Sequence, residues 1–280
     1  MRHYSVLLAA VLLALASCQG GKSGSATVEA AADSVVINDS LSAVDSLLAE
    51  LSELPVPKAA DELFDDFLYN FAANRKLQME RILFPLRMVS GDKVETIDRG
   101  HWQLERFFMR QGYYTALFDS ERHMEVVKDT SVSRAVVEKI FLDTHKVSQY
   151  DFRRLHGAWM LVEVRSVPFE QSANASFLPF YSQFASSLEF QRSHLAGEVR
   201  FVGPDPDDDF AIMEGVITPD TWEAFAPQLP QKMLYNIIYG NPRPEGKSKL
   251  FVLRGIANGF ELQMTFDRDG DSWKLSKLST

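Results

Sequence analysis

Apolar side chains recur along two separate stretches of the chain with the period of an α-helix. Phe64, Phe67 and Phe71 are spaced by three and four residues, which places them on one helical face. The same spacing returns 113 positions later in a second trio, Phe177, Phe180 and Phe184. The pattern predicts one amphipathic helix near the start of each half of a duplicated chain.

Other positions repeat in the same order after each helix. Ile97 and Trp102 in the first half match Ile217 and Trp222, both 120 positions later. The segment 114–118 (Tyr-Thr-Ala-Leu-Phe) parallels the segment 235–239 (Tyr-Asn-Ile-Ile-Tyr). A constant order with drifting offsets is expected after duplication and loop insertion, and the insertion in the second half includes the Pro- and Asp-rich stretch 203–209.

Each half continues into segments with the alternation of β-strands and ends in a glycine turn followed by tryptophan, Gly157…Trp159 and Gly270…Trp273. The strand-like segments are 136–142, 159–164, 249–254, 260–266 and 273–278. Helices first and an antiparallel sheet afterwards is an α+β arrangement. The sequence predicts two tandem repeats, residues 58–168 and 169–280, each with N-terminal helices packed on a curved antiparallel sheet.

The first residues have the pattern of an export signal. A basic start is followed by an apolar run over residues 6–16 and then by Leu15-Ala16-Ser17-Cys18. This short apolar core with small residues before a cleavage site is typical of a signal peptide, here residues 1–17. Leu-Ala-Ser-Cys resembles the bacterial lipobox, which implies that Cys18 is lipidated and becomes the mature N-terminus. Cys18 is also the chain's one cysteine, so no intramolecular disulfide can form.

Residues 18–57 read as a flexible, partly helical linker. Three Asp-Ser-aliphatic triplets lie in it, with Ser34, Ser40 and Ser46 at their centres. The triplets resemble the O-glycosylation signal of exported Bacteroidetes proteins, which makes the three serines candidate acceptors. The alternative is that Asp and Ser simply solvate a stalk. Gln19, in place of aspartate after the cysteine, favours the outer membrane, with the membrane face left open.

The order of elements in each half, ending in a Gly-turn-Trp strand, resembles the nuclear transport factor two-like fold. In that cystatin-like fold a curved sheet wraps a long N-terminal helix into a cone. Together with the lipobox, the pattern also resembles uncharacterised Bacteroidetes lipoproteins that carry two tandem domains of unknown function. The fold hosts enzymes, binding modules and dimerisation domains, so the resemblance implies no reaction.

Composition and motifs exclude several classes of function. A formal net charge of −9 disfavours nucleic-acid binding, because phosphate neutralisation needs a basic surface. No nucleotide, zinc or serine-hydrolase motif occurs, and we expect no cofactor and no metal. Asp267-Arg268-Asp269-Gly270-Asp271 resembles a calcium loop, but its glycine is in the wrong position, and an Asp-Gly hairpin turn explains it better.

Two sets of side chains are candidates for chemistry or binding. The titratable set lies in the first half and consists of His101, His145, His156, Asp143 and Asp151. An aromatic set, which would stack on sugar rings or peptide side chains if exposed and would pack in the core otherwise, includes Trp102, Trp222, Tyr114 and Tyr235.

The leading hypothesis is a lipid-anchored cell-envelope protein that binds a ligand, an envelope protein or a glycan without catalysis. Its membrane contact is the N-terminal lipid, and its binding surface is a cone mouth or the groove between the halves. The alternative is a small enzyme of the proton-transfer or lyase type, with its active site in one cone. Such an enzyme needs a pocket with convergent ionisable groups.

Overall fold

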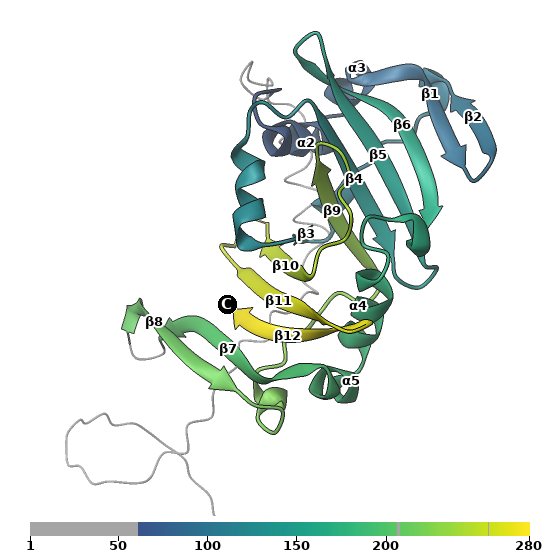
Figure 1. Ribbon diagram of the computed structural model, residues 1–280. Coiled ribbons are helices and arrows are strands. Elements are labelled where there is room, and N and C mark those ends of the chain that lie inside the picture. The colour runs from purple at the N-terminus through teal and green to yellow at the C-terminus, as the bar shows by residue number, and fades with distance from the viewer. Residues whose placement is uncertain (1–60, 206–207, 257) are drawn as a thin grey trace, which may run out of the picture. The chain divides into compact units, whose positions relative to one another are not determined.

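The computed structural model describes residues 61–205, 208–256 and 258–280 (Figure 1). Each half begins with a pair of helices, and the phenylalanine spacing predicts the first helix of each pair. They are α2 (Phe64–Ala73), α3 (Arg75–Glu80), α4 (Phe177–Ser186) and α5 (Leu188–Ser193). The second helix of each pair has an N-cap at an equivalent position: Asn74 Oδ1 accepts from Leu77 N at 3.0 Å, and Ser187 Oγ accepts from Phe190 N at 3.1 Å.

Each half contributes six strands to the described structure. Those of the first half are β1 (Ile82–Ser90), β2 (Lys93–Ile97), β3 (Tyr113–Phe118), β4 (Arg134–Phe141), β5 (Lys146–Leu155) and β6 (Ala158–Pro168). Those of the second half are β7 (Leu195–Asp205), β8 (Asp208–Ile217), β9 (Met233–Tyr239), β10 (Ser248–Gly255), β11 (Glu261–Asp269) and β12 (Ser272–Ser279). Short 3-10 helices connect them: η2 (Arg99–His101), η3 (Phe107–Arg110), η4 (Glu121–Lys128), η5 (Phe169–Gln171) and η6 (Trp222–Ala224).

The α+β class predicted from the sequence is confirmed, and all five strand-like segments are strands. The two glycine turns close hairpins. His156 and Gly157 have φ values of 51° and 81° between the paired residues Leu155 and Ala158. Positive φ at both central residues is the geometry that joins twisted antiparallel strands in a two-residue turn. Asp269 and Ser272 likewise flank Gly270, whose φ is 60°.

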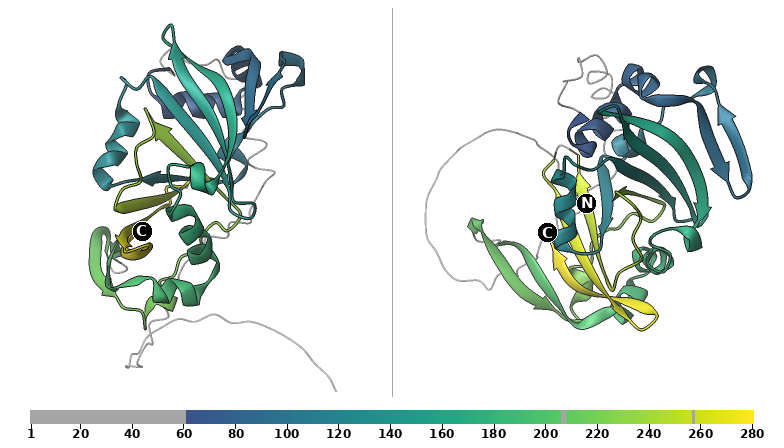
Figure 2. Two further views of the ribbon diagram at one scale, coloured as in Figure 1. Left: turned by 45° about the vertical axis from the view of Figure 1, so that its right-hand side comes forward. Right: turned by 45° about the horizontal axis from the view of Figure 1, so that its top comes forward.

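Two hairpins were not predicted from the sequence, β1–β2 and β7–β8. In the Pro- and Asp-rich stretch, residues 203–205 end β7 and residues 208–209 begin β8, the two strands of the second hairpin (Figure 2). The sheets are also not purely antiparallel. β1 pairs in parallel with β6, and β7 pairs in parallel with β12. In each repeat, the first strand of the hairpin therefore lies beside the last strand of that repeat.

The two six-stranded sheets exchange strands between the halves. Sheet A has the order β2-β1-β6-β5-β4-β9, and sheet B has the order β3-β10-β11-β12-β7-β8. β9 therefore completes the sheet of the first half, and β3 completes that of the second (Figure 1). The sequence boundary at residue 168 coincides with the end of β6, but neither sheet is made from one half alone.

The pairing of the exchanged strands β3 and β9 shows that the sequence alignment of these two segments was wrong by one residue. Leu117 of β3 pairs with Phe251 of β10, and Ile237 of β9 pairs with Val137 of β4. Because Phe251 and Val137 occupy equivalent positions, Leu117 is equivalent to Ile237, at an offset of 120. Matching Tyr114 to Tyr235 was wrong by one position, a shift that moves every side chain to the opposite face of the sheet.

Candidate functional site

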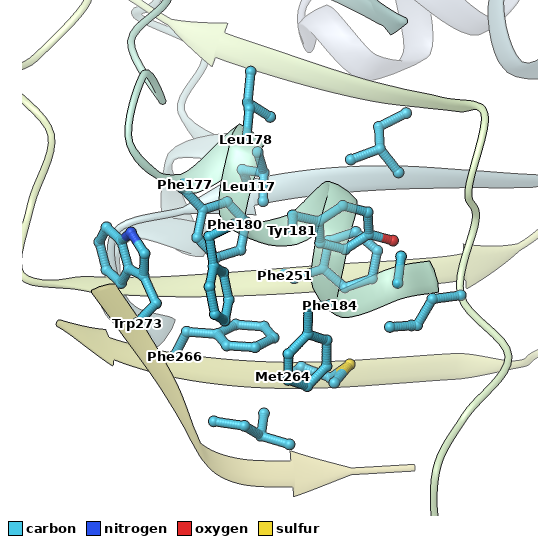
Figure 3. Packing of buried hydrophobic residues seen from close by; sticks show 14 of the residues in the cluster. Leu117, Phe177, Leu178, Phe180, Tyr181, Phe184, Phe251, Met264, Phe266 and Trp273 are labelled. Atoms are coloured by element: carbon cyan, nitrogen blue, oxygen red, sulfur yellow. The ribbon is translucent and has the colours of Figure 1, made fainter. Parts of the chain in front are cut away.

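Aromatic side chains fill the space between helix and sheet in both repeats. In the first repeat, the rings of Phe64, Phe67 and Phe71 pack on Phe152, with centroids 5.2–5.8 Å apart. In the second repeat, Phe177, Phe180 and Phe184 pack on Phe266 at 5.1–5.6 Å (Figure 3). Trp159 and Trp273 are fully buried in the same two clusters. These rings fill the space between the helix pair and the sheet in each repeat.

The candidate tryptophans belong to a duplicated structural contact. Trp102 Nε1 donates to Gln78 Oε1 at 2.9 Å, and Trp222 Nε1 donates to Gln191 Oε1 at 2.8 Å. Each glutamine also donates to a backbone carbonyl of the preceding helix, Phe71 O at 3.0 Å or Phe184 O at 2.8 Å. Trp222 is 0% exposed and Trp102 is partly buried, so both tie a loop to a helix pair.

The candidate tyrosines lie close to the strand exchange. Tyr235 is 2% exposed, and its ring packs edge-on against Phe108 at 6.0 Å. Burial raises the pKa of Tyr235 far above its ordinary value. Tyr114 is half-buried beside the same phenylalanine and accepts a hydrogen bond from Arg254 Nη1 at 3.3 Å. Core packing, the alternative considered from the sequence, accounts for Tyr235 and Trp222, since neither has a face open to a ligand.

The candidate titratable residues do not converge. His101 and Asp143 are exposed. His145 and His156 are exposed turn residues with φ values of 52° and 51°. Asp151 is buried and binds Arg134 and Arg153 in ion pairs of 3.1 and 3.2 Å. Within the described residues these groups form no acid–base pair of the kind that proton transfer requires.

A buried polar network marks the point where the repeats exchange strands. Asn236 Oδ1 accepts from Leu117 N at 2.9 Å, and Asn236 Nδ2 donates to Glu138 Oε2 at 2.8 Å. Gln149 Nε2 donates to the other oxygen of Glu138 at 3.0 Å. Burial raises the pKa of the Glu138 carboxyl above its ordinary value, although these two hydrogen bonds act in the opposite direction. The network joins β3, β9, β4 and β5.

A charged groove of about 310 Å³ lies on the face of sheet A opposite α2. Its lining, which we call the arginine groove, comes from β1, β4, β5 and β6 and consists of Arg87, Arg134, Val136, Gln149, Asp151, Arg153, Glu163 and Arg165. Alternation within the strands explains this placement, since Val137 and Phe152 point into the core and their neighbours Val136 and Asp151 point the other way. Four arginines face two carboxylates, which gives the groove a net charge of +2.

Ion pairs across neighbouring strands hold the arginine groove together. Glu163 lies between Arg87 and Arg165, at 3.1 and 2.8 Å. Asp151 binds Arg134 through two hydrogen bonds of 3.1 Å and Arg153 through one of 3.2 Å. Both carboxylates are largely buried, whereas the side chains of Arg87 and Arg153 are each 55% exposed. The exposed guanidinium groups retain donors for a planar anionic group.

The charges of the arginine groove are not repeated in the second half. At the equivalent positions of sheet B, Arg134 is replaced by Ser248, Asp151 by Thr265 and Arg165 by Ser279. Arg153 and Glu163 correspond to Asp267 and Lys277. Among the six charged residues of the groove, Arg87 alone keeps its residue type, as Arg200. Features that the fold requires, such as the Gln–Trp contacts, occur twice. A groove that occurs once is therefore not a requirement of the fold.

Sequence reasoning missed the arginine groove, because its residues come from four strands and meet only through the register of the sheet. The one signal in the sequence was a pair of opposite charges two residues apart in each strand, Asp151 with Arg153 and Glu163 with Arg165. In the described parts of the chain, no helix is long and apolar enough to cross a membrane. The same residues hold no group of three or more His, Cys, Asp or Glu side chains suited to a metal ion. Cys18, Ser34, Ser40 and Ser46 lie outside the described residues.

The duplicated helix-then-sheet arrangement defines the class of the protein as NTF2-like α+β. Its structure is similar to the crystal structure of an NTF2-like protein from Bacteroides fragilis NCTC 9343, with a TM-score of 0.72 and 41% sequence identity over 80% of this chain and 98% of that chain. The chain belongs to the family described as Domain of unknown function (DUF4348), which it matches over residues 43–280. No curated protein matches the sequence.

Proposed function

We propose that this protein is a lipid-anchored, non-catalytic protein of the bacterial cell envelope that binds an anionic partner in the arginine groove. The observation that carries the proposal is the net positive groove of one repeat in a chain whose formal charge is −9. A carboxylate, sulfate or phosphate group matches the planar donors of exposed arginines. The absence of aromatic side chains from the groove lining disfavours stacking on a neutral sugar.

The remainder of the proposal rests on the sequence and on the packing of the cones. Leu15-Ala16-Ser17-Cys18 supports a lipid at Cys18, and Gln19 supports the outer membrane. The aromatic rings that fill both cones support binding at the surface in preference to catalysis in a pocket. Modification of Ser34, Ser40 and Ser46 by glycans would keep the linker extended from the membrane.

A binding panel tests the function and separates the two sources of negative charge. The purified protein is titrated with a sulfated oligosaccharide, a polyglutamate peptide and a neutral oligosaccharide, at low and at physiological salt. We expect one of the two anionic probes to bind, with an affinity that falls as salt screens the arginines. Tighter binding of the oligosaccharide identifies a glycan partner, and tighter binding of the peptide identifies a protein. Binding of the neutral oligosaccharide alone would overturn the proposal, as would failure of all three probes.

Two measurements on natively produced protein test the anchor. Growth with a labelled fatty acid should label the wild type and not a Cys18→Ser variant, because serine offers no thiol for the thioether. Mass spectrometry of linker peptides should find added hexose mass at the three serines. Unlabelled wild type would refute the lipid anchor, and unmodified peptides would refute glycosylation.

A further inference from the structure

A second, smaller cavity lies where the strand exchange brings the two repeats together. We call it the junction cavity, and its volume is about 40 Å³. Asp119 and His123 line it from the first repeat, at the end of β3 and in η4. Asn174, Arg243 and Lys249 line it from the second repeat. It is separate from the arginine groove and shares none of its lining residues.

The charges that line the junction cavity do not balance. Lys249 is 3% exposed, and its Nζ donates to Asp119 Oδ1 at 2.7 Å. An ammonium group has three N–H donors, and within the described residues this bond is the one that Lys249 makes. Arg243 adds a second positive charge, so Lys249 and Arg243 against Asp119 leave a net charge of +1. The excess charge is that of Arg243, which is exposed, whereas the buried Lys249 is paired with Asp119.

A buried amide also lacks a protein partner. Asn174 is 4% exposed, and its side-chain amide makes no hydrogen bond among the described residues. Its backbone, in contrast, is bonded, since Asn174 N donates to Ser172 Oγ at 3.1 Å and Asn174 O accepts from Leu178 N at 3.0 Å. The Asn174 side chain lines the junction cavity, so its amide donors and acceptor can bind a ligand there.

The size of the junction cavity limits its occupant. The volume of about 40 Å³ is small, which favours an occupant with few heavy atoms. A carboxylate group has three heavy atoms and accepts hydrogen bonds in one plane, which suits an amide and a guanidinium together.

We propose that the junction cavity binds a small carboxylate such as formate or acetate, held by Lys249, Arg243 and Asn174. The bound anion would neutralise the excess positive charge and connect the two repeats at the strand exchange. The same positive charges act on His123. Burial and the charges of Arg243 and Lys249 lower the pKa of His123 from its ordinary value of 6.5, while Asp119 acts in the opposite direction.

NMR titration of the purified, isotope-labelled protein with sodium acetate tests the proposal. We expect a saturable shift of the Asn174 side-chain amide signals and a rise in the pKa of His123 at saturation. Arg243→Gln removes an exposed residue and should weaken acetate binding about fivefold, the loss of roughly 1 kcal/mol of interaction. Lys249→Met should abolish it. Arg200→Gln, an equal charge change on the β7–β8 hairpin, should leave the affinity unchanged.

Three results would overturn the inference. The first is a shift of Asn174 that grows linearly with acetate and equals the shift produced by sodium chloride. The second is unchanged acetate affinity in Arg243→Gln, which does not depend on whether the Lys249 variant folds. The third is a His123 pKa that stays constant while the Asn174 signal saturates.

Discussion

Thr115 and Tyr235 contact each other at equivalent positions of the two exchanged strands. Thr115 Oγ1 donates to Tyr235 O at 2.6 Å and accepts from Tyr235 N at 2.8 Å. One buried hydroxyl thus satisfies both backbone groups of a residue in the other repeat. The contact joins β3 and β9, the strands that leave their own halves, and fixes the register at which the repeats meet.

Replacement of Thr115 by valine tests this contact, because it keeps the shape of the side chain and removes the hydroxyl. The two backbone groups of Tyr235 would lose their partner in a buried position, which costs about 1–3 kcal/mol. We expect the free energy of unfolding, measured with urea, to fall by that amount. Thr265→Val in β11 is the matched control, because the Thr265 side chain makes no hydrogen bond within the described residues. Equal effects of the two changes would contradict the role of Thr115.

The strand exchange predicts that the two repeats unfold together. Residues 58–168 lack β9, and their β3 has no sheet to join. We expect the isolated segment to show no cooperative thermal transition, while the complete chain shows one transition by both circular dichroism and tryptophan fluorescence. A folded, cooperatively melting 58–168 segment would show that the exchange is not required for either sheet.

The duplicated Gln–Trp contacts predict that loss of either glutamine lowers the stability of the protein by a similar amount. Gln191→Leu removes the acceptor of the buried Trp222 Nε1 and should destabilise the protein by about 1–3 kcal/mol. Gln78→Leu should cost at least as much, because Gln78 also accepts from Glu105 N at 2.9 Å. A double-mutant cycle of Gln191→Leu with Trp222→Phe should give a coupling energy of about 0.5–3 kcal/mol. A coupling energy near zero would mean that the indole N–H does not depend on Gln191.

Because burial raises the pKa of the Glu138 carboxyl, we expect the stability of the folded protein to depend on pH. The folded-state pKa of Glu138 is raised by burial, so the folded protein holds a proton that the unfolded chain releases above pH 4.5. The wild type therefore loses stability as the pH rises from 4.5 through the raised pKa. Glu138→Gln removes this titration, and its stability relative to the wild type should increase between pH 4 and pH 8 in urea unfolding. Glu214→Gln, at an exposed ion pair, serves as the control. A difference that stays constant with pH would contradict the account.

Sequence patterns identified what is local or repeated in this fold. The phenylalanine spacing placed α2 and α4, and the glycine turns placed the hairpins β5–β6 and β11–β12, because each depends on neighbouring residues. The repeat also identified Trp102 and Trp222 as equivalent, although their glutamine partners were not noticed. The alignment of segment 114–118 was wrong by one residue, because it matched Tyr114 to Tyr235 and did not take account of which side chains of each strand share a face.

The strand exchange and the sites could not be read from the sequence in the same way. Periodicity shows that a segment is a strand, but it does not show which sheet the strand joins. The arginine groove depends on the register of four strands, and Asp119 reaches Lys249 only because β3 crosses to sheet B. Long-range contacts of this kind leave no local pattern.

The arginine groove itself is tested most directly by a paired charge change. Arg87→Gln with Arg153→Gln lowers the net charge of the groove from +2 to 0, while Glu163 keeps Arg165 and Asp151 keeps Arg134. Both replaced side chains are exposed, so we expect the stability of the protein to change by less than about 0.5 kcal/mol. Arg192→Gln with Arg200→Gln removes two exposed, ion-paired arginines outside the groove and is the matched control.

The decisive measurement is the affinity of these two double variants, by calorimetry, for the anionic probe that binds the wild type. Two exposed charges are worth about 1–2 kcal/mol together, so the Arg87/Arg153 variant should bind roughly tenfold more weakly. The Arg192/Arg200 control should bind like the wild type. Equal losses in both variants, or no loss in either, would contradict the assignment of the arginine groove as the binding site.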